Sequence, residues 1–88
     1  DELKVIEAPG HSPGSVCFYC TAQNFVIGGD VLFQRSIGRT DLPGGSHETL
    51  LKNIQQKLLV LPEETIVYSG HGSTTTIGEE KKYNPFLN

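Results

Sequence analysis

The segment that follows Ser46 constrains the possible folds more than any other part of this chain. Its apolar residues recur at the three- and four-residue spacing of a helix, at Leu50, Leu51, Ile54, Leu58 and Leu61. Lysine, asparagine and glutamine occupy the positions between them. Ser46 is a good N-cap and Pro62 ends the pattern, so we predict a helix over residues 47–59. A helix with one apolar stripe has to bury that stripe against a neighbouring layer.

Strand-like segments surround this helix and could supply that layer. Apolar, β-branched and aromatic residues bounded by turn signals predict strands over residues 3–8, 15–20, 25–29 and 65–69. The second and third strands would form a hairpin through the turn-like sequence TAQN. Residues 33–45 are rich in glycine, and we expect them to form a long loop.

A second, shorter helix is predicted near the end of the chain. Thr76 and Glu79 form a capping box for a helix near Ile77–Tyr83, which Asn84-Pro85 would end. The order is then strand, hairpin, helix, strand, helix. This order predicts an α/β, or layered α+β, fold with a mixed β-sheet and two helices, and with too few strands for a complete sandwich.

Length and composition narrow the class of protein and its partners. The 88 residues suit one small domain, and ten glycines with 36% hydrophobic residues are typical of a loop-rich globular chain. The net charge is −3 and the longest basic run is Lys81-Lys82, so we expect neither nucleic acid nor a membrane as partner. No apolar run approaches the ~20 residues that span a bilayer, and no leader opens the chain, so we expect a cytoplasmic protein. The absence of methionine predicts a processed or cut piece of something longer.

The two cysteines, Cys17 and Cys20, form a C-x-x-C pattern. A redox pair of this spacing belongs at the start of a helix, whereas the surrounding SVCFYC is typical of a strand. Positions three apart in a strand point to opposite faces. We therefore expect two independent reduced thiols, which also fit a cytoplasmic protein.

Three metal-competent side chains lie beside glycine at the ends of predicted strands. His11 lies in the loop APGHSPGS, where residues 12–15 fit a type II turn; Asp30 ends VIGGD; His71 follows TIVYS and a glycine. Glycine lets the backbone bend sharply and approach closely, and imidazole with carboxylate suits Zn, Fe or Mn. Each residue alone is more often a plain turn or cap residue. Spacing by itself therefore does not decide whether these three residues are metal ligands or ordinary turn and cap residues.

Four sequence blocks, taken together, resemble one family. APGHSPGS, VIGGDVLF, SIGRTDLPGGS and YSGHGSTTTIGEEKKYNPFL resemble consecutive motifs of the metallo-β-lactamase superfamily, and are most similar to its glyoxalase II-like (hydroxyacylglutathione hydrolase-like) members. The resemblance implies half of an αββα sandwich with a dinuclear metal site at the strand ends. Residues 1–88 would then be a single C-terminal fragment of such a domain, with the N-terminal half absent.

The resemblance also implies a role for each candidate ligand. His11 would complete the ligands of the first metal, Asp30 would bridge both metals, and His71 would bind the second. The remaining ligands in the family come from an H-x-H-x-D-H motif that this sequence lacks. His47 begins the predicted helix alone, and we expect it to face solvent.

The reaction implied by the resemblance is hydrolysis of a small-molecule thioester, such as hydroxyacylglutathione, by metal-bound hydroxide. Two zinc ions are expected per complete domain, with iron or manganese possible, and Asp30 would hold the metals and orient the nucleophile. The full-length parent would be the enzyme, and the fragment alone would be inactive. One alternative is an iron-dependent sulfur dioxygenase-like oxidoreductase on the same fold. Another is a non-catalytic piece that pairs with its missing half or self-associates through open sheet surface.

The loop GRTDLPGGS leaves three possibilities for Arg39. It could pair with Asp41 and hold the loop in place, which is the interpretation we favour. It could instead hydrogen-bond Asp30 and tune a metal ligand. Substrate binding is the third possibility.

Overall fold

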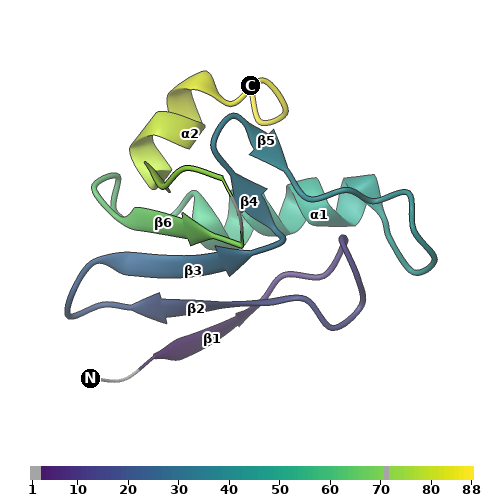
Figure 1. Ribbon diagram of the computed structural model, residues 1–88, viewed down its shortest axis with the longest axis horizontal. Coiled ribbons are helices and arrows are strands. Elements are labelled where there is room, and N and C mark those ends of the chain that lie inside the picture. The colour runs from purple at the N-terminus through teal and green to yellow at the C-terminus, as the bar shows by residue number, and fades with distance from the viewer. Residues whose placement is uncertain (1–2, 71) are drawn as a thin grey trace.

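The computed structural model describes residues 3–70 and 72–88 as seven strands and three helical segments. A five-stranded sheet has the order β1-β2-β3-β6-β7, and β4 and β5 form a separate pair (Figure 1). The strands are β1 (Lys4–Glu7), β2 (Val16–Cys20), β3 (Phe25–Gly29), β4 (Leu32–Phe33), β5 (Ser36–Ile37), β6 (Ile66–Ser69) and β7 (Thr75–Thr76). The helical segments are α1 (His47–Asn53), η1 (Ile54–Leu58) and α2 (Ile77–Tyr83).

The sheet is mixed, as predicted. β1, β2 and β3 pair antiparallel, β3 and β6 pair parallel, and β7 returns antiparallel beside β6. The parallel pair needs a long connection, and α1 with η1 provides it on the far side of the sheet in Figure 1. The tight β2–β3 turn is closed by Asn24 at φ 55°, a conformation that asparagine tolerates better than most residues.

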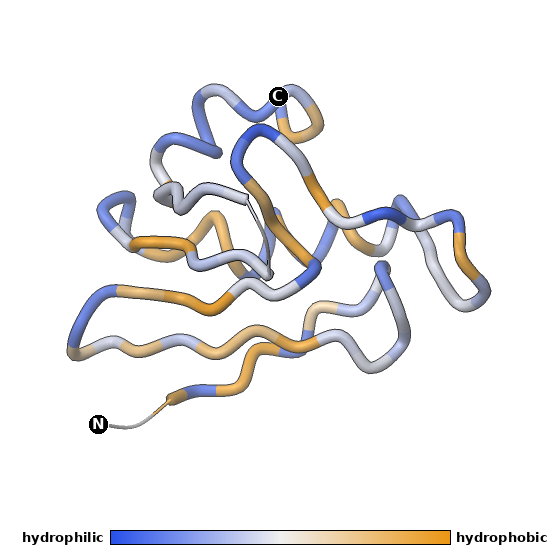
Figure 2. The backbone as a smooth tube through the Cα atoms, in the orientation of Figure 1, coloured by the Kyte–Doolittle hydropathy of each residue, from blue (hydrophilic) through white to orange (hydrophobic). Residues whose placement is uncertain are grey.

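One face of the sheet forms the core against the helices. A cross-strand row of Tyr19, Val26, Val67 and Thr75 runs across β2, β3, β6 and β7, and every member is buried. The apolar stripe that the sequence predicted packs on this face through Leu50, Ile54 and Leu58, all fully buried. The apolar stretches of these strands are visible in Figure 2.

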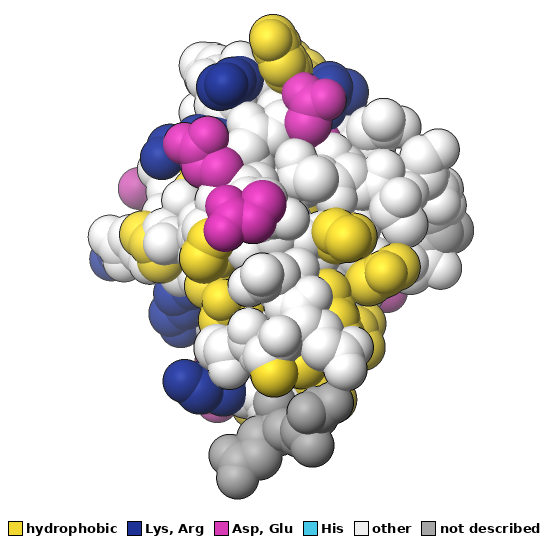
Figure 3. Space-filling model, turned by 90° about the vertical axis from the view of Figure 1, so that its left-hand side faces the viewer, with side chains coloured by type: hydrophobic (Ala, Val, Ile, Leu, Met, Phe, Trp, Pro, Cys, Tyr) yellow, Lys and Arg dark blue, Asp and Glu magenta, His cyan; other side chains and the backbone are white. Residues whose placement is uncertain are grey.

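The opposite face of the sheet carries a second hydrophobic row that remains exposed. Val5, Phe18, Ile27 and Tyr68 are neighbours across β1, β2, β3 and β6, and their exposed fractions are 61%, 37%, 39% and 44%. Hydrophobic side chains also reach the surface around the end of the sheet in Figure 3. We call Val5, Phe18, Ile27 and Tyr68 the outer row. These four residues form a contiguous exposed apolar row rather than scattered single residues.

The predicted first helix forms, with a change of geometry part-way along it. The Ser46 side chain accepts a hydrogen bond from the Thr49 amide at 3.3 Å, which confirms the predicted N-cap. After Asn53 the helix widens into the π-helical turns of η1, where the Leu59 amide donates to the Ile54 carbonyl at 2.9 Å. His47 is exposed at the start of α1, as predicted.

The expectation of a long loop over residues 33–45 is wrong in its first part. β4 and β5 form a short antiparallel hairpin there, with Leu32 opposite Ile37 and Phe33 opposite Ser36. Two-residue strands leave almost no periodic pattern, and the turn between them places Arg35 at φ 60°, where glycine or asparagine would be the usual signal. The hairpin was therefore not readable from local sequence.

The second helix agrees with its prediction at both ends. α2 spans Ile77–Tyr83, and Thr76 accepts a hydrogen bond from the Glu79 amide at 3.1 Å. In a full capping box the Glu79 carboxylate would also accept from the Thr76 amide. The described contact of this carboxylate is instead with Arg35 Nη2, at 3.5 Å. No helix in the described part of the chain is long and apolar enough to cross a membrane.

Cys17 and Cys20 are both free and buried, which confirms two independent thiols. Burial raises the pKa of the Cys17 thiol to about 11. Because the thiolate is the nucleophile, fewer than about one Cys17 in a hundred would be ionised at pH 8. We expect Cys17 to resist iodoacetamide at pH 8 in the native protein and to react once urea unfolds it. Peptide mass analysis measures this, and equal rates in both states would contradict the described burial.

Candidate metal centre

The loop that carries His11 is hydrogen-bonded to α1 at both ends of that helix. The Ser46 amide donates to the Gly10 carbonyl at 2.7 Å, and Asn53 Nδ2 donates to the Pro9 carbonyl at 3.2 Å. Gly10 is buried at φ +136°, and a Cβ placed on it would lie 2.4 Å from the Leu50 Cα. Glycine is therefore required here both for its backbone conformation and for the contact with the helix.

The tip of the same loop differs from the type II turn that the sequence suggested. The Ser15 amide does donate to the Ser12 carbonyl, at 3.3 Å, so a turn is present. Gly14 is not among the glycines with positive φ, which a type II turn requires at that position. The Ser12 and Ser15 hydroxyls are hydrogen-bonded to each other, with their oxygens 2.9 Å apart.

The His11 imidazole is oriented by a backbone carbonyl. Nδ1 lies 2.8 Å from the Arg39 carbonyl oxygen, which can only accept a hydrogen bond. Nδ1 therefore carries the proton in the neutral ring, and Nε2 keeps its lone pair. Nε2 lies 3.9 Å from Asp30 Oδ2, too far for a hydrogen bond. An imidazole held in this way is prepared to bind a metal through Nε2.

Asp30 is presented by a tight turn at the end of β3. Gly29 adopts φ +52°, and the Val31 amide donates to the Gly28 carbonyl at 2.9 Å, so the strand bends away and leaves the carboxylate in the open. The Asp30 side chain is 58% exposed. Gly38 crosses directly over this turn, since a Cβ placed on it would lie 2.0 Å from the Asp30 carbonyl oxygen and 3.4 Å from the His11 Cβ.

His11 and Asp30 line the same cavity, whose volume is about 650 Å³. Most of the remaining wall comes from the β4–β5 hairpin and the chain that follows it. The lining residues other than His11 and Asp30 are Phe33, Gln34, Ser36, Ile37, Gly38, Arg39, Gly72 and Ser73. The cavity therefore combines two possible metal ligands with an apolar wall and several polar groups, as ligand sites commonly do.

The third predicted ligand, His71, lies outside the described residues. Its neighbours in sequence are described: a Cβ on Gly70 would lie 3.2 Å from Asp30 Oδ1, and Gly72 lines the cavity. Within residues 3–70 and 72–88, no three histidine, cysteine, aspartate or glutamate side chains gather as a metal site. The ligand roles of His11, Asp30 and His71 therefore remain predictions.

The two described donors nonetheless fit a metal ion. Zinc binds imidazole nitrogen and carboxylate oxygen at roughly 2.0–2.2 Å, so two such donors at a tetrahedral ion lie about 3.4 Å apart. The observed separation of 3.9 Å between Nε2 and Oδ2 is close to that value. Small side-chain rotations would bring both atoms onto one ion.

Arg39 pairs with Asp41, the interpretation favoured from the sequence. Arg39 Nε lies 2.8 Å from Asp41 Oδ1 and Nη2 lies 3.0 Å from Oδ2, a two-point contact at the surface. The hydrogen bond from Arg39 lowers the pKa of the Asp41 carboxyl. The described contacts of the Arg39 side chain do not include Asp30. The Arg39 backbone carbonyl instead accepts the hydrogen bond from His11 Nδ1.

Comparison with known proteins places the chain in a family. The model of the metallo-beta-lactamase superfamily matches residues 1–71. The chain belongs to this superfamily. The α/β fold, with its mixed sheet and two helices, is the corresponding fragment of the metallo-beta-lactamase fold.

Two curated relatives illustrate the similarity. The chain is 58% identical over 86 residues to the probable metallo-hydrolase YqgX of Bacillus subtilis, a match that covers 98% of this chain and 41% of that relative. It is 51% identical over 86 residues to the hydroxyacylglutathione hydrolase GloC of Haemophilus influenzae, again covering 98% of this chain and 41% of the relative. The chain thus spans about two-fifths of the length of these curated relatives.

Two solved structures agree closely with the fold. BLEG-1, described as a B3 metallo-beta-lactamase, gives a TM-score of 0.94 at 59% identity and covers 97% of this chain and 41% of its own. TTHA1623 in a di-iron-bound form gives a TM-score of 0.93 at 48% identity and covers 97% of this chain and 42% of its own. Because one of these neighbours holds iron, the superfamily implies metal binding without specifying zinc.

Proposed function

We propose that this chain is the C-terminal part of a metal-dependent hydrolase that cleaves thioesters such as hydroxyacylglutathione. The observation that carries the proposal is the convergence of the His11 Nε2 and the Asp30 carboxylate on one cavity, in a chain of the metallo-beta-lactamase superfamily. The similarity to a protein named as a hydroxyacylglutathione hydrolase supports this substrate class. The isolated chain would be inactive, because the H-x-H-x-D-H ligands are missing from it.

His11, Asp30 and His71 would hold the metal ions from this side of the site. The bound metals would supply a water of lowered pKa and would polarise the thioester carbonyl. The Arg39 carbonyl keeps the proton of the neutral His11 ring on Nδ1, so that the lone pair of Nε2 faces the cavity side and can bind a metal. Asp30 contributes negative charge and orients the attacking group, while Phe33 and Ile37 provide an apolar wall for the substrate.

A second candidate is an iron-dependent sulfur dioxygenase-like oxidoreductase on the same fold. The close similarity to a structure in a di-iron-bound form supports iron as the metal for this candidate, and the oxygenase reaction is inferred from the resemblance alone. The two candidates predict different metals and different consumption of oxygen.

The experiment is metal analysis and assay of the longer protein that carries this chain. Purified protein is reconstituted separately with zinc, iron and manganese, and is given the lactoyl thioester of glutathione, a glutathione persulfide and a β-lactam. Thioester cleavage without oxygen uptake supports the proposal. Dominant iron with persulfide-dependent oxygen uptake favours the second candidate, and failure to cleave the thioester with any metal contradicts the first.

We also propose that the outer row is covered by another part of the protein. Val5, Phe18, Ile27 and Tyr68 leave a hydrophobic face exposed, and the chain spans only 41% of its relatives' length, so the remainder of a longer protein is the natural occupant. The isolated chain should then self-associate through this face. We expect oligomers in sedimentation at high concentration. A sharply monomeric species that binds no added N-terminal half would contradict this.

A further inference from the structure

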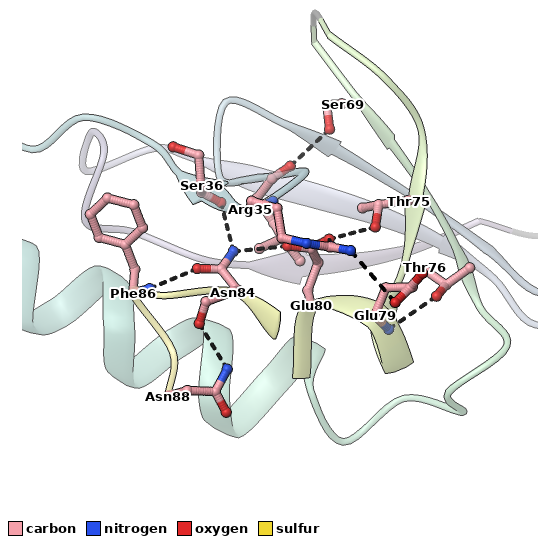
Figure 4. Close-up of polar contacts among 11 residues, drawn as sticks. Arg35, Ser36, Ser69, Thr75, Thr76, Glu79, Glu80, Asn84, Phe86 and Asn88 are labelled. Atoms are coloured by element: carbon pink, nitrogen blue, oxygen red, sulfur yellow. Dashed lines mark hydrogen bonds and ion pairs between the residues drawn. The ribbon is translucent and has the colours of Figure 1, made fainter. Parts of the chain in front are cut away.

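Glu80 is a fully buried carboxylate that the proposed chemistry does not use. It lies on α2 with an exposed fraction of 0%. A buried charge is unfavourable unless it is paired and hydrogen-bonded. Glu80 meets this requirement completely: Oε1 accepts from the Arg35 amide at 2.7 Å and from Asn84 Nδ2 at 3.0 Å, and Oε2 accepts from Arg35 Nη1 at 2.6 Å and from the Thr75 hydroxyl (Figure 4).

These contacts join the β4–β5 hairpin to the C-terminal helix. Arg35 is the second of the two turn residues of the hairpin, held at φ 60°, and donates hydrogen bonds to Glu80 from both its amide and its guanidinium. Asn84, at the end of α2, connects to the hairpin directly, because its Nδ2 also donates to the Ser36 carbonyl at 3.1 Å. At the base of the hairpin, the Ser69 hydroxyl donates to the Leu32 carbonyl at 3.0 Å. The hairpin is therefore held at its tip by α2 and at its base by β6.

The opposite side of the same hairpin faces the cavity. Phe33, Gln34, Ser36 and Ile37 line it, whereas Arg35 does not. The chain leaves β5 through Gly38, whose amide donates to the Val31 carbonyl at 3.0 Å and which lies against Asp30 and His11. A displacement of the hairpin tip would consequently move the apolar wall relative to both candidate ligands.

We propose that Arg35 and Glu80 are positioning residues for the substrate cavity. Their ion pair, buried on the Glu80 side, holds the β4–β5 hairpin as a fixed wall and so determines how large a thiol or acyl group the cavity accepts. This inference rests on the proposed thioester hydrolase function for its substrate, although the position of the wall can be measured without it. The Arg35 guanidinium is confined further by the Tyr83 ring, whose centroid lies 5.3 Å away.

The test compares three variants of the longer protein. Glu80→Gln keeps the shape and removes the charge. Arg35→Lys keeps the charge but removes the planar guanidinium, whose Nη1 donates to Glu80 Oε2 and whose face lies over the Tyr83 ring. Glu79→Gln is the matched control, because it removes only the exposed partner of Arg35. If Glu80→Gln fails to fold, Arg35→Lys still tests the positioning role. We expect this variant to fold, because the Arg35 side chain is partly exposed and the hydrogen bond from its backbone amide to Glu80 does not depend on the side chain.

Two measurements are expected to change in Glu80→Gln and Arg35→Lys and to stay unchanged in Glu79→Gln. Amide hydrogen exchange should become faster at Arg35 and Gly38 but not in β2 and β3. KM should rise about tenfold for a bulky thioester and less for a small one, with kcat and metal content nearly constant.

Unchanged exchange at Gly38 in both variants would overturn the inference. Equally faster exchange across the whole sheet would do so too, because it would indicate a general loss of stability. If the parent protein cleaves no thioester, the proposed function fails, and the exchange measurement alone then decides the positioning role.

Discussion

Replacement of Gly10 by alanine is expected to lower the free energy of unfolding by about 3 kcal/mol or more. Two separate effects contribute. The φ of +136° is strained for a residue with a side chain, at about 1–3 kcal/mol, and the new Cβ would lie 2.4 Å from the Leu50 Cα, which forces the loop away from α1 at a similar cost. Urea unfolding of the longer protein, followed by circular dichroism, measures the change.

Two other glycines separate these effects. Gly14 lies in the same loop with no neighbour within 4 Å of an added Cβ and no positive φ, so Gly14→Ala should be neutral or slightly stabilising. Gly29 has φ +52° but open space, so Gly29→Ala should show the conformational cost alone, about 1 kcal/mol. A Gly10→Ala protein as stable as Gly14→Ala would contradict the close contact between the loop and α1.

Replacement of Asp30 by asparagine is expected to reduce thioesterase activity of the longer protein by about 100-fold or more. The change keeps the shape of the side chain but removes the charge that Asp30 would supply as the proposed bridging ligand. Loss of outer-shell partners alone typically costs 10–100-fold in affinity or activity, and a direct ligand should cost at least as much. Metal content by mass spectrometry should fall with the activity, while the unfolding midpoint of metal-free protein should stay nearly constant, because Asp30 is mostly exposed.

Glu64→Gln is the matched control for this experiment. Glu64 is an exposed acid away from the cavity, so the same loss of one carboxylate should leave metal content and activity unchanged. Full metal occupancy and full activity in Asp30→Asn would rule out Asp30 as a ligand and would remove the main support for the proposed function.

Features that depend on neighbours within a few residues were predictable from the sequence. The caps at Ser46 and Thr76 act on amides three residues ahead, and α2 begins and ends where its cap and Asn84-Pro85 indicated. The apolar stripe of the first helix identified Leu50, Ile54 and Leu58 as core because a helical period depends only on spacing. The motifs around His11, Asp30 and His71 indicated the superfamily.

Features that depend on distant partners were decided only by the tertiary structure. The His11 imidazole is oriented by a carbonyl 28 residues away, and Glu80 is paired with Arg35 across 45 residues. No local pattern encodes such contacts, because each depends on how the sheet, hairpin and helices pack. The short hairpin of β4 and β5 was missed for a related reason. Its four strand residues show too little periodicity to predict a strand. The hairpin is stabilised by hydrogen bonds to Glu80, Asn84 and Ser69, which belong to other elements.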